Sequence, residues 1–253
     1  MDIRHSRPWS LAQRAVRKVF LPPPVQSRHA EYSMVFCADE SPSTPSERLL
    51  GIALDAITAA RSQDLSEIQA RLRGRFRFPD SIVQTWPGEH YRLLAGLVQT
   101  LKPKKVLEIG TAEGISALAL RKNLPPGGQV ITFDIIPWQS YANVCLENAD
   151  LEDETIIQLI DNLGDRQTAQ RHSTLLAEAD LIFIDAAKDG QLETRLIANL
   201  EMVKSERAPI VVFDDIRVWN MLAIWHNLRW PKLDITSFGH WSGTGICELR
   251  LPT

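Results

Sequence analysis

The stretch VLEIGTAEGIS, residues 106–116, decides the fold of this chain. It is an apolar run, interrupted by Glu108, that breaks into small residues punctuated by Gly110 and Gly114. Glycine allows a tight turn and the close approach of the backbone to a ligand. Because ligands of open α/β sheets bind at the carboxyl ends of the strands, the stretch predicts a strand that ends in a ligand-binding loop.

The segments that follow alternate between continuous apolar runs and helix-like spacing. Continuous apolar runs are typical of strands covered on both faces, and repeated strand–helix units indicate a parallel, doubly wound sheet. Strands are predicted over 105–109, 130–134, 156–160, 181–185 and 210–213, and helices over 115–124, 140–149, 166–176, 192–203 and 216–228.

Two more strands are predicted near the end of the sequence, over 233–238 and 246–251. The linker GHWSGTG is too short for the crossover that parallel strands need. The two segments must therefore form a hairpin, so one strand of this mostly parallel, Rossmann-like sheet runs antiparallel.

The first part of the chain is organised differently. Residues 1–43 are predicted to be a basic tail and linker, whose segment WSLAQRAVRKVF could contact an anionic membrane or a partner; a loosely packed tail is the simpler interpretation. Thr44-Pro45-Ser46-Glu47 has the pattern of a helix start, with Thr44 as the cap. We expect one domain over 44–253, with a helical cap over 44–103 and a cofactor-binding core over 104–253. Further helices are predicted over 64–74 and 89–101.

The composition is that of an ordinary globular protein, with 253 residues, 44% hydrophobic and 23% charged. The net charge of −3 gives no reason to expect a nucleic-acid partner. Three cysteines without metal-ligand spacing indicate a reducing compartment. We expect a cytoplasmic location, because no apolar run approaches a membrane span and the start lacks the apolar centre of a signal peptide.

The loop after the first strand departs from a dinucleotide-binding fingerprint, which needs G-x-G-x-x-G. Ala112 stands at the second glycine position, and the carboxylate of Glu108 would repel a pyrophosphate but suits an ammonium or sulfonium cation. Asp134 ends the second strand, 134 − 108 = 26 residues further on, where an acid can accept ribose hydroxyls. The combination indicates S-adenosylmethionine rather than NAD. Asp161 and Asn162, after the third strand, are placed to meet the adenine, although any polar turn there has the same appearance.

The next two strands also end in acids: LIFIDAAKD carries Asp185 and Lys188, and IVVFDDI carries Asp214 and Asp215. Three carboxylates that converge on one sheet edge repel one another unless something compensates. A hard divalent cation such as Mg²⁺ takes oxygen ligands and keeps positions open for water or substrate. Lys188 is then placed to accept a proton from a substrate hydroxyl. Helix caps and a salt bridge to Lys188 are the structural alternative.

The motifs VLEIGTAEGISALAL, ITFDI, LIFIDAAKD and IVVFDDI resemble those of the cation-dependent, catechol-type class I O-methyltransferases, over about residues 86–253. The resemblance implies a seven-stranded sheet with one antiparallel strand. It also implies Mg²⁺ binding by the three aspartates and a general-base role for Lys188. The cofactor contacts that it implies or that the loop suggests are Glu108, Gly110, Thr111, Gly114, Ser116, Asp134, Asp161, Asn162 and Asp185.

Two departures bear on the acceptor. The catechol enzymes carry an aspartate–asparagine pair where this chain has Asp214-Asp215, a pair more similar to that of macrolide-sugar O-methyltransferases. The segment SFGHWSGTGI has no catechol-type counterpart, so His240, Trp241 and Ser242 are candidates to line a different acceptor pocket. His240 is a candidate second base or substrate contact, against the simpler interpretation of a turn histidine. Packing roles are predicted for Trp219, Trp225 and Trp230.

The hypothesis is therefore an S-adenosylmethionine-dependent O-methyltransferase that acts, with Mg²⁺, on a hydroxyl of a sugar, phenol or other natural product. Two alternatives stay open: a metal-independent N-, C- or carboxyl-methyltransferase, and a non-catalytic cofactor-binding or scaffold protein. A dinucleotide-dependent enzyme is a distant third. The helical region over 44–78 is expected to cover the acceptor pocket or to form a homodimer contact.

Overall fold

The computed structural model describes residues 42–83, 90–203, 205 and 207–249. The chain divides into two compact units, Met1–Val35 and Phe36–Thr253, and the described residues all belong to the second. The predicted basic tail lies outside the described residues, apart from its last two positions, and the boundary at residue 44 stays a prediction. Among the described residues, no helix has the length and apolar character that would let it cross a membrane.

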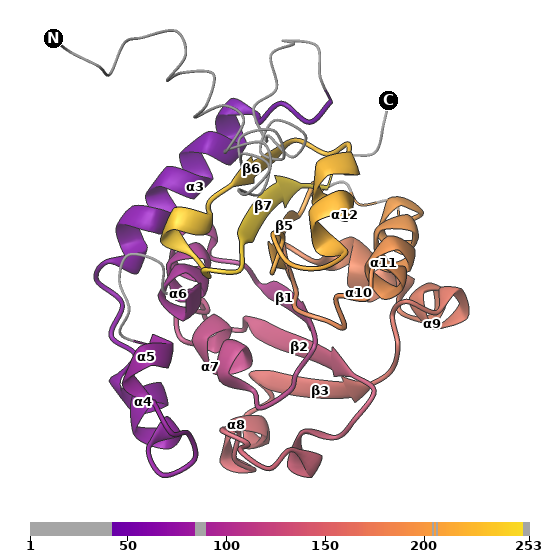
Figure 1. The fold of residues 1–253 in the computed structure, drawn as a ribbon. Coiled ribbons are helices and arrows are strands. Elements are labelled where there is room, and N and C mark those ends of the chain that lie inside the picture. The colour runs from indigo at the N-terminus through magenta and orange to yellow at the C-terminus, as the bar shows by residue number, and fades with distance from the viewer. Residues whose placement is uncertain (1–41, 84–89, 204, 206, 250–253) are drawn as a thin grey trace, which may run out of the picture. The chain divides into compact units, whose positions relative to one another are not determined.

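The centre of the second unit is a seven-stranded sheet in the order β3-β2-β1-β4-β5-β7-β6 (Figure 1). The pairs from β3 to β5 are parallel, and β7 runs antiparallel to both β5 and β6. The predicted fold class is confirmed. The strands are β1 (Lys105–Ile109), β2 (Gln129–Asp134), β3 (Ile156–Ile160), β4 (Leu181–Ile184), β5 (Ile210–Asp214), β6 (Lys232–Asp234) and β7 (Thr244–Glu248).

Helices cover both faces of the sheet, as an all-buried parallel sheet requires. Figure 1 shows α3, α6 and α7 on one side and α9 to α12 on the other. One apolar core joins residues of α3 and α6 to the strands, so the helical cap and the sheet share their packing. The helices are α3 (Glu47–Ala60), α4 (Ser66–Leu72), α5 (Asp80–Val83), α6 (His90–Leu101), α7 (Ile115–Arg121), α8 (Ala149–Glu152), α9 (Arg166–Arg171), α10 (Ser173–Glu178), α11 (Gln191–Glu201) and α12 (Met221–Asn227).

The predicted helix over 140–149 is wrong. The segment holds only a 3₁₀ turn, Trp138–Ser140, and then irregular chain up to α8. The backbone N–H of Cys145 donates to the carbonyl of Glu113 at 2.8 Å, which ties this segment to the loop after β1. A tertiary hydrogen bond therefore replaces the local helical one.

Other element boundaries also move. The cap of α3 is Ser46 and not Thr44, because the Ser46 hydroxyl accepts from the backbone N–H of Leu49 at 3.0 Å. The predicted strand over 233–238 stops after β6, where Asp234 accepts from both the backbone and the hydroxyl of Thr236 and starts a 3₁₀ turn. The predicted helix over 166–176 is two helices, broken at His172, and the helix predicted from residue 216 begins only at Met221.

The packing of α3 on α6 gives a matched pair of glycine substitutions. A Cβ added at Gly96 on α6 would lie 2.5 Å from the carbonyl oxygen of Ala56 and 2.9 Å from the nitrogen of Ala60, whereas one added at Gly51 on α3 meets nothing within 4 Å. We predict that Gly96→Ala lowers the free energy of unfolding by about 1–3 kcal/mol, because two helix backbones must separate. Gly51→Ala should raise it by about 0.5–1 kcal/mol through helix propensity. Urea unfolding of both variants measures the difference, and equal effects would contradict this packing.

Candidate active site at the carboxyl edge of the sheet

The glycine-rich loop leaves β1 at the point where the strand order reverses, between β1 and β4. Gly110 and Gly114 have φ values of 106° and 81°, which non-glycine residues rarely adopt. A Cβ at Gly110 would collide with the carbonyl of Asp185, and a Cβ at Gly114 with the side chain of Leu146. Both glycines are therefore required by backbone conformation and close packing. The loop is held directly against the end of β4.

Asp134, at the end of β2, holds this loop in place. One carboxylate oxygen accepts from the backbone N–H groups of Thr111 and Ala112 at 3.0 and 3.1 Å, and the other accepts from Ile136 at 3.1 Å. The Thr111 hydroxyl is buried and lies 2.7 Å from that of Thr132. The acid predicted to meet a ribose thus already organises the glycine loop, and the Tyr141 hydroxyl donates to it as well at 3.3 Å.

Glu108 is fully buried in β1 beneath the loop. Neither carboxylate oxygen has a hydrogen-bond partner among the described residues. Burial raises the pKa of Glu108 to about 8. The nearby hydroxyls of Ser116 and Thr132 lower it and so offset part of this rise. At neutral pH the group is therefore mostly protonated until a cation compensates its charge.

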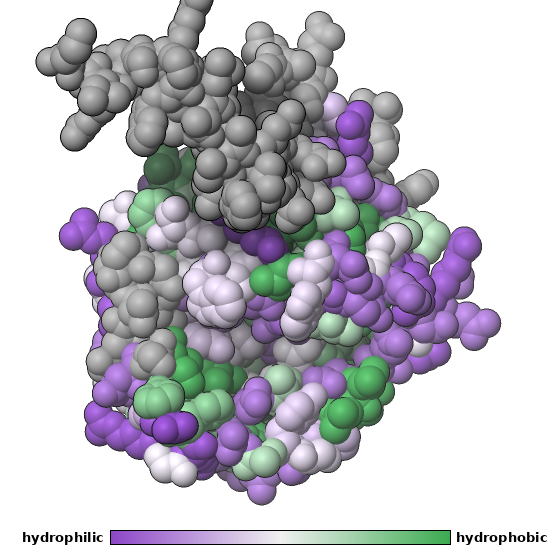
Figure 2. All heavy atoms as spheres, in the orientation of Figure 1, coloured by the Kyte–Doolittle hydropathy of each residue, from purple (hydrophilic) through white to green (hydrophobic). Residues whose placement is uncertain are grey.

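The polar residues after β3 are engaged within the chain. Asp161 lies 2.7 Å from the ring of His172 and 3.0 Å from Arg171, and the hydrogen bond from His172 lowers its pKa. Asn162 accepts from the backbone of Gly164 at 2.9 Å. Figure 2 shows hydrophobic side chains exposed where β2 and β3 end, and the exposed apolar residues of these segments are Ile135, Ile136 and Ile160.

The three predicted metal ligands come together. Single carboxylate oxygens of Asp185, Asp214 and Asp215 all lie within 4.8 Å of one another. Lys188 lies between two of them, with its Nζ 2.5 Å from Asp185 and 2.7 Å from Asp215. Burial alone would lower the pKa of Lys188, but attraction to the two carboxylates outweighs it and raises the pKa above its ordinary value. The amine is therefore protonated when no other cation is present.

Two histidines complete the cluster, and sequence reasoning missed one of them. Nδ1 of His90, the first residue of α6, lies 3.5 Å from Asp214, and Nδ1 of His240 lies 3.4 Å from the same carboxylate oxygen and 3.5 Å from Asp215. Burial opposes a charge on His240, yet the two carboxylates raise its pKa to about 10. The Ser242 hydroxyl lies 2.8 Å from His240 Nδ1. The sequence pattern around His90 does not mark it as a site residue, because its partner Asp214 lies far along the chain.

Glu193 is a second residue that the sequence analysis did not single out. Its buried carboxylate accepts from the backbone N–H of Lys188 at 2.6 Å and from that of Gly190 at 3.0 Å. Lys188 has a φ of 57°, an unfavourable left-handed conformation that needs such support. Glu193 stands at the third position of α11, where a carboxylate commonly returns to the preceding backbone. That spacing is the signal that could have identified it.

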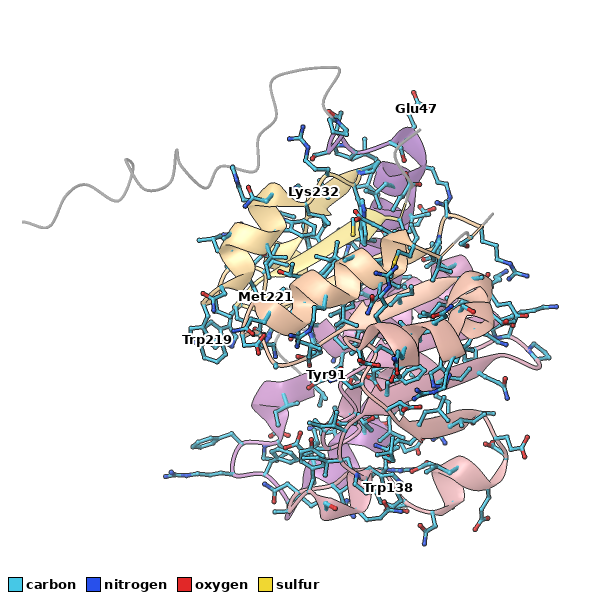
Figure 3. All side chains as sticks on the ribbon, turned by 90° about the vertical axis from the view of Figure 1, so that its right-hand side faces the viewer. Glu47, Tyr91, Trp138, Trp219, Met221 and Lys232 are labelled. Carbon is cyan, nitrogen blue, oxygen red and sulfur yellow. The ribbon has the colours of Figure 1, made fainter. Side chains whose placement is uncertain are left out.

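The tryptophans divide into two groups. Trp225 and Trp230 are buried, as predicted, but the packing role predicted for Trp219 is wrong, because its side chain is 77% exposed. Figure 3 shows Trp219 at the edge of the molecule. Trp241, beside His240, is 81% exposed. Two indoles in neighbouring loops therefore contact solvent near the acid cluster.

Comparison with known proteins gives the family. A family model described as O-methyltransferase matches residues 60–226, so the chain belongs to the O-methyltransferase family. Catechol O-methyltransferase B of Danio rerio is 28% identical over 127 residues, 49% of this chain and 47% of that protein, so the match spans about half of the relative. A probable caffeoyl-CoA O-methyltransferase of Dictyostelium discoideum is 23% identical over 180 residues, 69% of each chain.

Solved structures agree with the fold. The SAH-bound methyltransferase PaMTH1 of Podospora anserina superimposes with a TM-score of 0.53 at 18% identity, over 81% of this chain and 98% of the other. A methyltransferase of Geobacter sulfurreducens gives a TM-score of 0.53 at 13% identity, over 82% and 100% of the two chains. At these identities the likeness concerns the fold alone.

The contacts of Glu193 generate a prediction about the Lys188 loop. Replacing Glu193 with alanine removes the acceptor of two backbone N–H groups, which should lower the free energy of unfolding by about 1–3 kcal/mol. Amide hydrogen exchange at Lys188 and Gly190 should accelerate, while exchange in β1 stays unchanged. Glu193→Gln keeps one acceptor oxygen and should give an intermediate effect. Unaltered exchange at both amides in the alanine variant would contradict a positioning role.

Proposed function

We propose that this chain is an S-adenosylmethionine-dependent O-methyltransferase that methylates a hydroxyl of a small molecule, assisted by a divalent cation. The observation that carries the proposal is the cluster of Asp185, Asp214, Asp215 and Lys188 at the sheet edge, directly beside the glycine loop. A methyl donor and a hydroxyl acceptor would meet at this edge. Family membership and the SAH-bound state of the structural neighbour PaMTH1 support it.

The described residues fit the cofactor. Glu108 would face the cationic end with a buried carboxyl whose oxygens accept no hydrogen bond within the part of the chain that the structure describes. Asp134, at the end of β2, would accept the ribose hydroxyls. The backbone of Gly110 and Thr111 and the helix start at Ser116 would line the methionine end. The exposed apolar side chains after β2 and β3 suit an adenine better than Asp161 does, because Asp161 is already paired with His172.

The residues also fit a divalent cation. One oxygen of Asp214 is buried and accepts no hydrogen bond among the described residues, and the imidazoles of His90 and His240 lie 3.5 and 3.4 Å from it, so it is available to a cation that displaces their protons. Asp185, Asp214 and Asp215 would hold Mg²⁺ through oxygen donors, which this ion prefers. The ion would supply Lewis acidity that lowers the pKa of the acceptor hydroxyl.

Lys188 would receive the proton of that hydroxyl on Nζ. Its ammonium is held by Asp185 and Asp215, so its raised pKa opposes this role while those carboxylates stay paired with it. When the carboxylates turn to a cation, the ammonium loses their stabilisation and its pKa falls. The chain's main contribution to rate would be the positioning of donor and acceptor against each other.

The acceptor would approach from the side of the 236–244 segment. His240 and Ser242 are hydrogen-bonding groups there, and the exposed rings of Trp219 and Trp241 offer flat apolar surfaces for a sugar or a phenol. α3 packs on α6 and exposes Leu50 and Leu54 on its outer side, which favours the dimer contact over the pocket cover among the two roles considered for this region.

The decisive experiment measures methyl transfer directly. Full-length protein is incubated with S-adenosylmethionine, Mg²⁺ and a panel of phenols, sugars and polyketide alcohols, and products are detected by mass spectrometry. We expect a mass gain of one methylene on one hydroxyl class, abolished by EDTA and reduced at least about a hundredfold in Asp214→Asn. Activity that survives both changes would support a metal-independent methyltransferase. Cofactor binding without any product would support a scaffold.

Glu108 gives a prediction about cofactor binding and pH. Its pKa is about 8, so the carboxyl is protonated at pH 6.5 and must release its proton to face a sulfonium or ammonium cation. Raising the pH from 6 toward 8 should therefore strengthen binding by up to about tenfold per unit. Calorimetric titration of S-adenosylmethionine in two buffers of different ionisation enthalpy should show release of nearly one proton at pH 6.5. Glu108→Gln, which imitates the protonated group, should abolish that release. Equal proton release by both proteins would contradict the assignment.

A further inference from the structure

We propose that His90, Asp214 and His240 form a second metal site, distinct in chemistry from the all-carboxylate site and sharing Asp214 with it. The site would take a borderline transition-metal ion of the Zn²⁺ or Co²⁺ class. This inference does not depend on methyl transfer, because it rests only on the donor atoms of these three residues, which all lie within 4.8 Å of one another.

The distances within the cluster are compatible with coordination of a tetrahedral ion. The Nδ1 atoms of His90 and His240 lie 3.5 and 3.4 Å from the same oxygen of Asp214. N–H···O hydrogen bonds are shorter, at about 2.7–3.2 Å. Ligand atoms about 2.0–2.1 Å from a tetrahedral Zn²⁺ ion are themselves about 3.3–3.4 Å apart. In an octahedral Mg²⁺ site with similar bond lengths, adjacent ligands are closer, at about 3.0 Å.

The surroundings also point to a ligand. That oxygen of Asp214 is buried without a hydrogen-bond partner among the described residues, and His90 is 7% exposed. The His90 ring packs edge-on against Tyr91 and Phe183, at centroid distances of 4.2 and 5.8 Å, so its orientation is fixed by packing. The Ser242 hydroxyl, 2.8 Å from Nδ1 of His240, can rotate away when that nitrogen binds an ion.

Donor chemistry separates the two overlapping sites. Two imidazoles and one carboxylate suit Zn²⁺, Co²⁺ or Ni²⁺, whereas three carboxylates suit Mg²⁺. Because Asp214 belongs to both sets, an ion in one site would compete with an ion in the other. The protein would therefore bind two classes of ion through two sets of residues that share Asp214. The rival explanation is that both imidazoles are protonated and simply pair with the aspartate.

The test is metal binding by the full-length protein after EDTA treatment and dialysis, with Zn²⁺, Co²⁺ and Mg²⁺ chlorides as probes. We expect Zn²⁺ to bind more tightly than Mg²⁺ and Co²⁺ to give the intense visible absorption of a tetrahedral ion. His90→Asn and His240→Ala should each weaken Zn²⁺ binding at least about tenfold. Neither should weaken Mg²⁺ binding, because the three carboxylates stay in place and a competing positive charge is removed. Asp185→Asn should weaken Mg²⁺ binding and leave Zn²⁺ binding nearly unchanged.

His226→Ala is the matched control, because His226 is an exposed histidine on α12 outside the cluster. It should leave both affinities unchanged. The inference is overturned if Co²⁺ shows only the weak absorption of an octahedral ion, or if Zn²⁺ affinity in folded His90→Asn and His240→Ala equals that of the unsubstituted protein. Titration of S-adenosylmethionine in the same samples separates this result from the proposed function, since loss of cofactor binding leaves the Zn²⁺ comparison intact.

Discussion

The pairing of the Lys188 ammonium with Asp185 and Asp215 is the interaction on which the site depends. β4 and β5 are neighbouring parallel strands, so the acids that follow them must end at the same place, and their charges must be balanced. Lys188 and Asp215, whose side chains pair at 2.7 Å, both adopt left-handed backbone conformations, with φ values of 57° and 58°. A conformation this costly for residues other than glycine persists only where surrounding contacts hold it, and Glu193 provides such contacts on the lysine side.

The glycine-rich loop after β1 and the acid cluster pack directly against each other. Gly110 packs so closely on the carbonyl of Asp185 that a methyl group would not fit between them, and Asp134 ties the next residues of the loop to β2. A change in the loop must therefore move the first residue of the acid cluster. This coupling explains why the sequence places glycine, and not alanine, after Ile109. Bringing donor and acceptor to a fixed separation is the task that such a joined framework performs.

The sequence predicted the strands well and the site only in part. Apolar runs with an acid at the end are local patterns, so the positions of Glu108 and Asp214 followed from the sequence. The helix expected over 140–149 failed because a backbone hydrogen bond from Cys145 to the glycine loop depends on tertiary structure. His90 escaped notice for a related reason: it lies at the start of α6, and only the folded chain brings it to a carboxylate 214 − 90 = 124 residues later. The protonation of Glu108 likewise depends on burial, which no spacing rule reports.

The charges already present in the acid cluster determine how a metal ion can bind there. Three aspartates face one ammonium and two imidazoles, and the raised pKa values of Lys188 and His240 mean that protons already neutralise much of the cluster. A divalent ion cannot add to these charges without displacing some of them, so its binding must release protons or free Lys188 from its partners. An ion that takes Asp185 and Asp215 frees the lysine, whereas an ion held by the histidines leaves the lysine paired. As proposed, the two sites would differ in more than metal preference, since only an ion at the carboxylate site would free Lys188 to accept a proton.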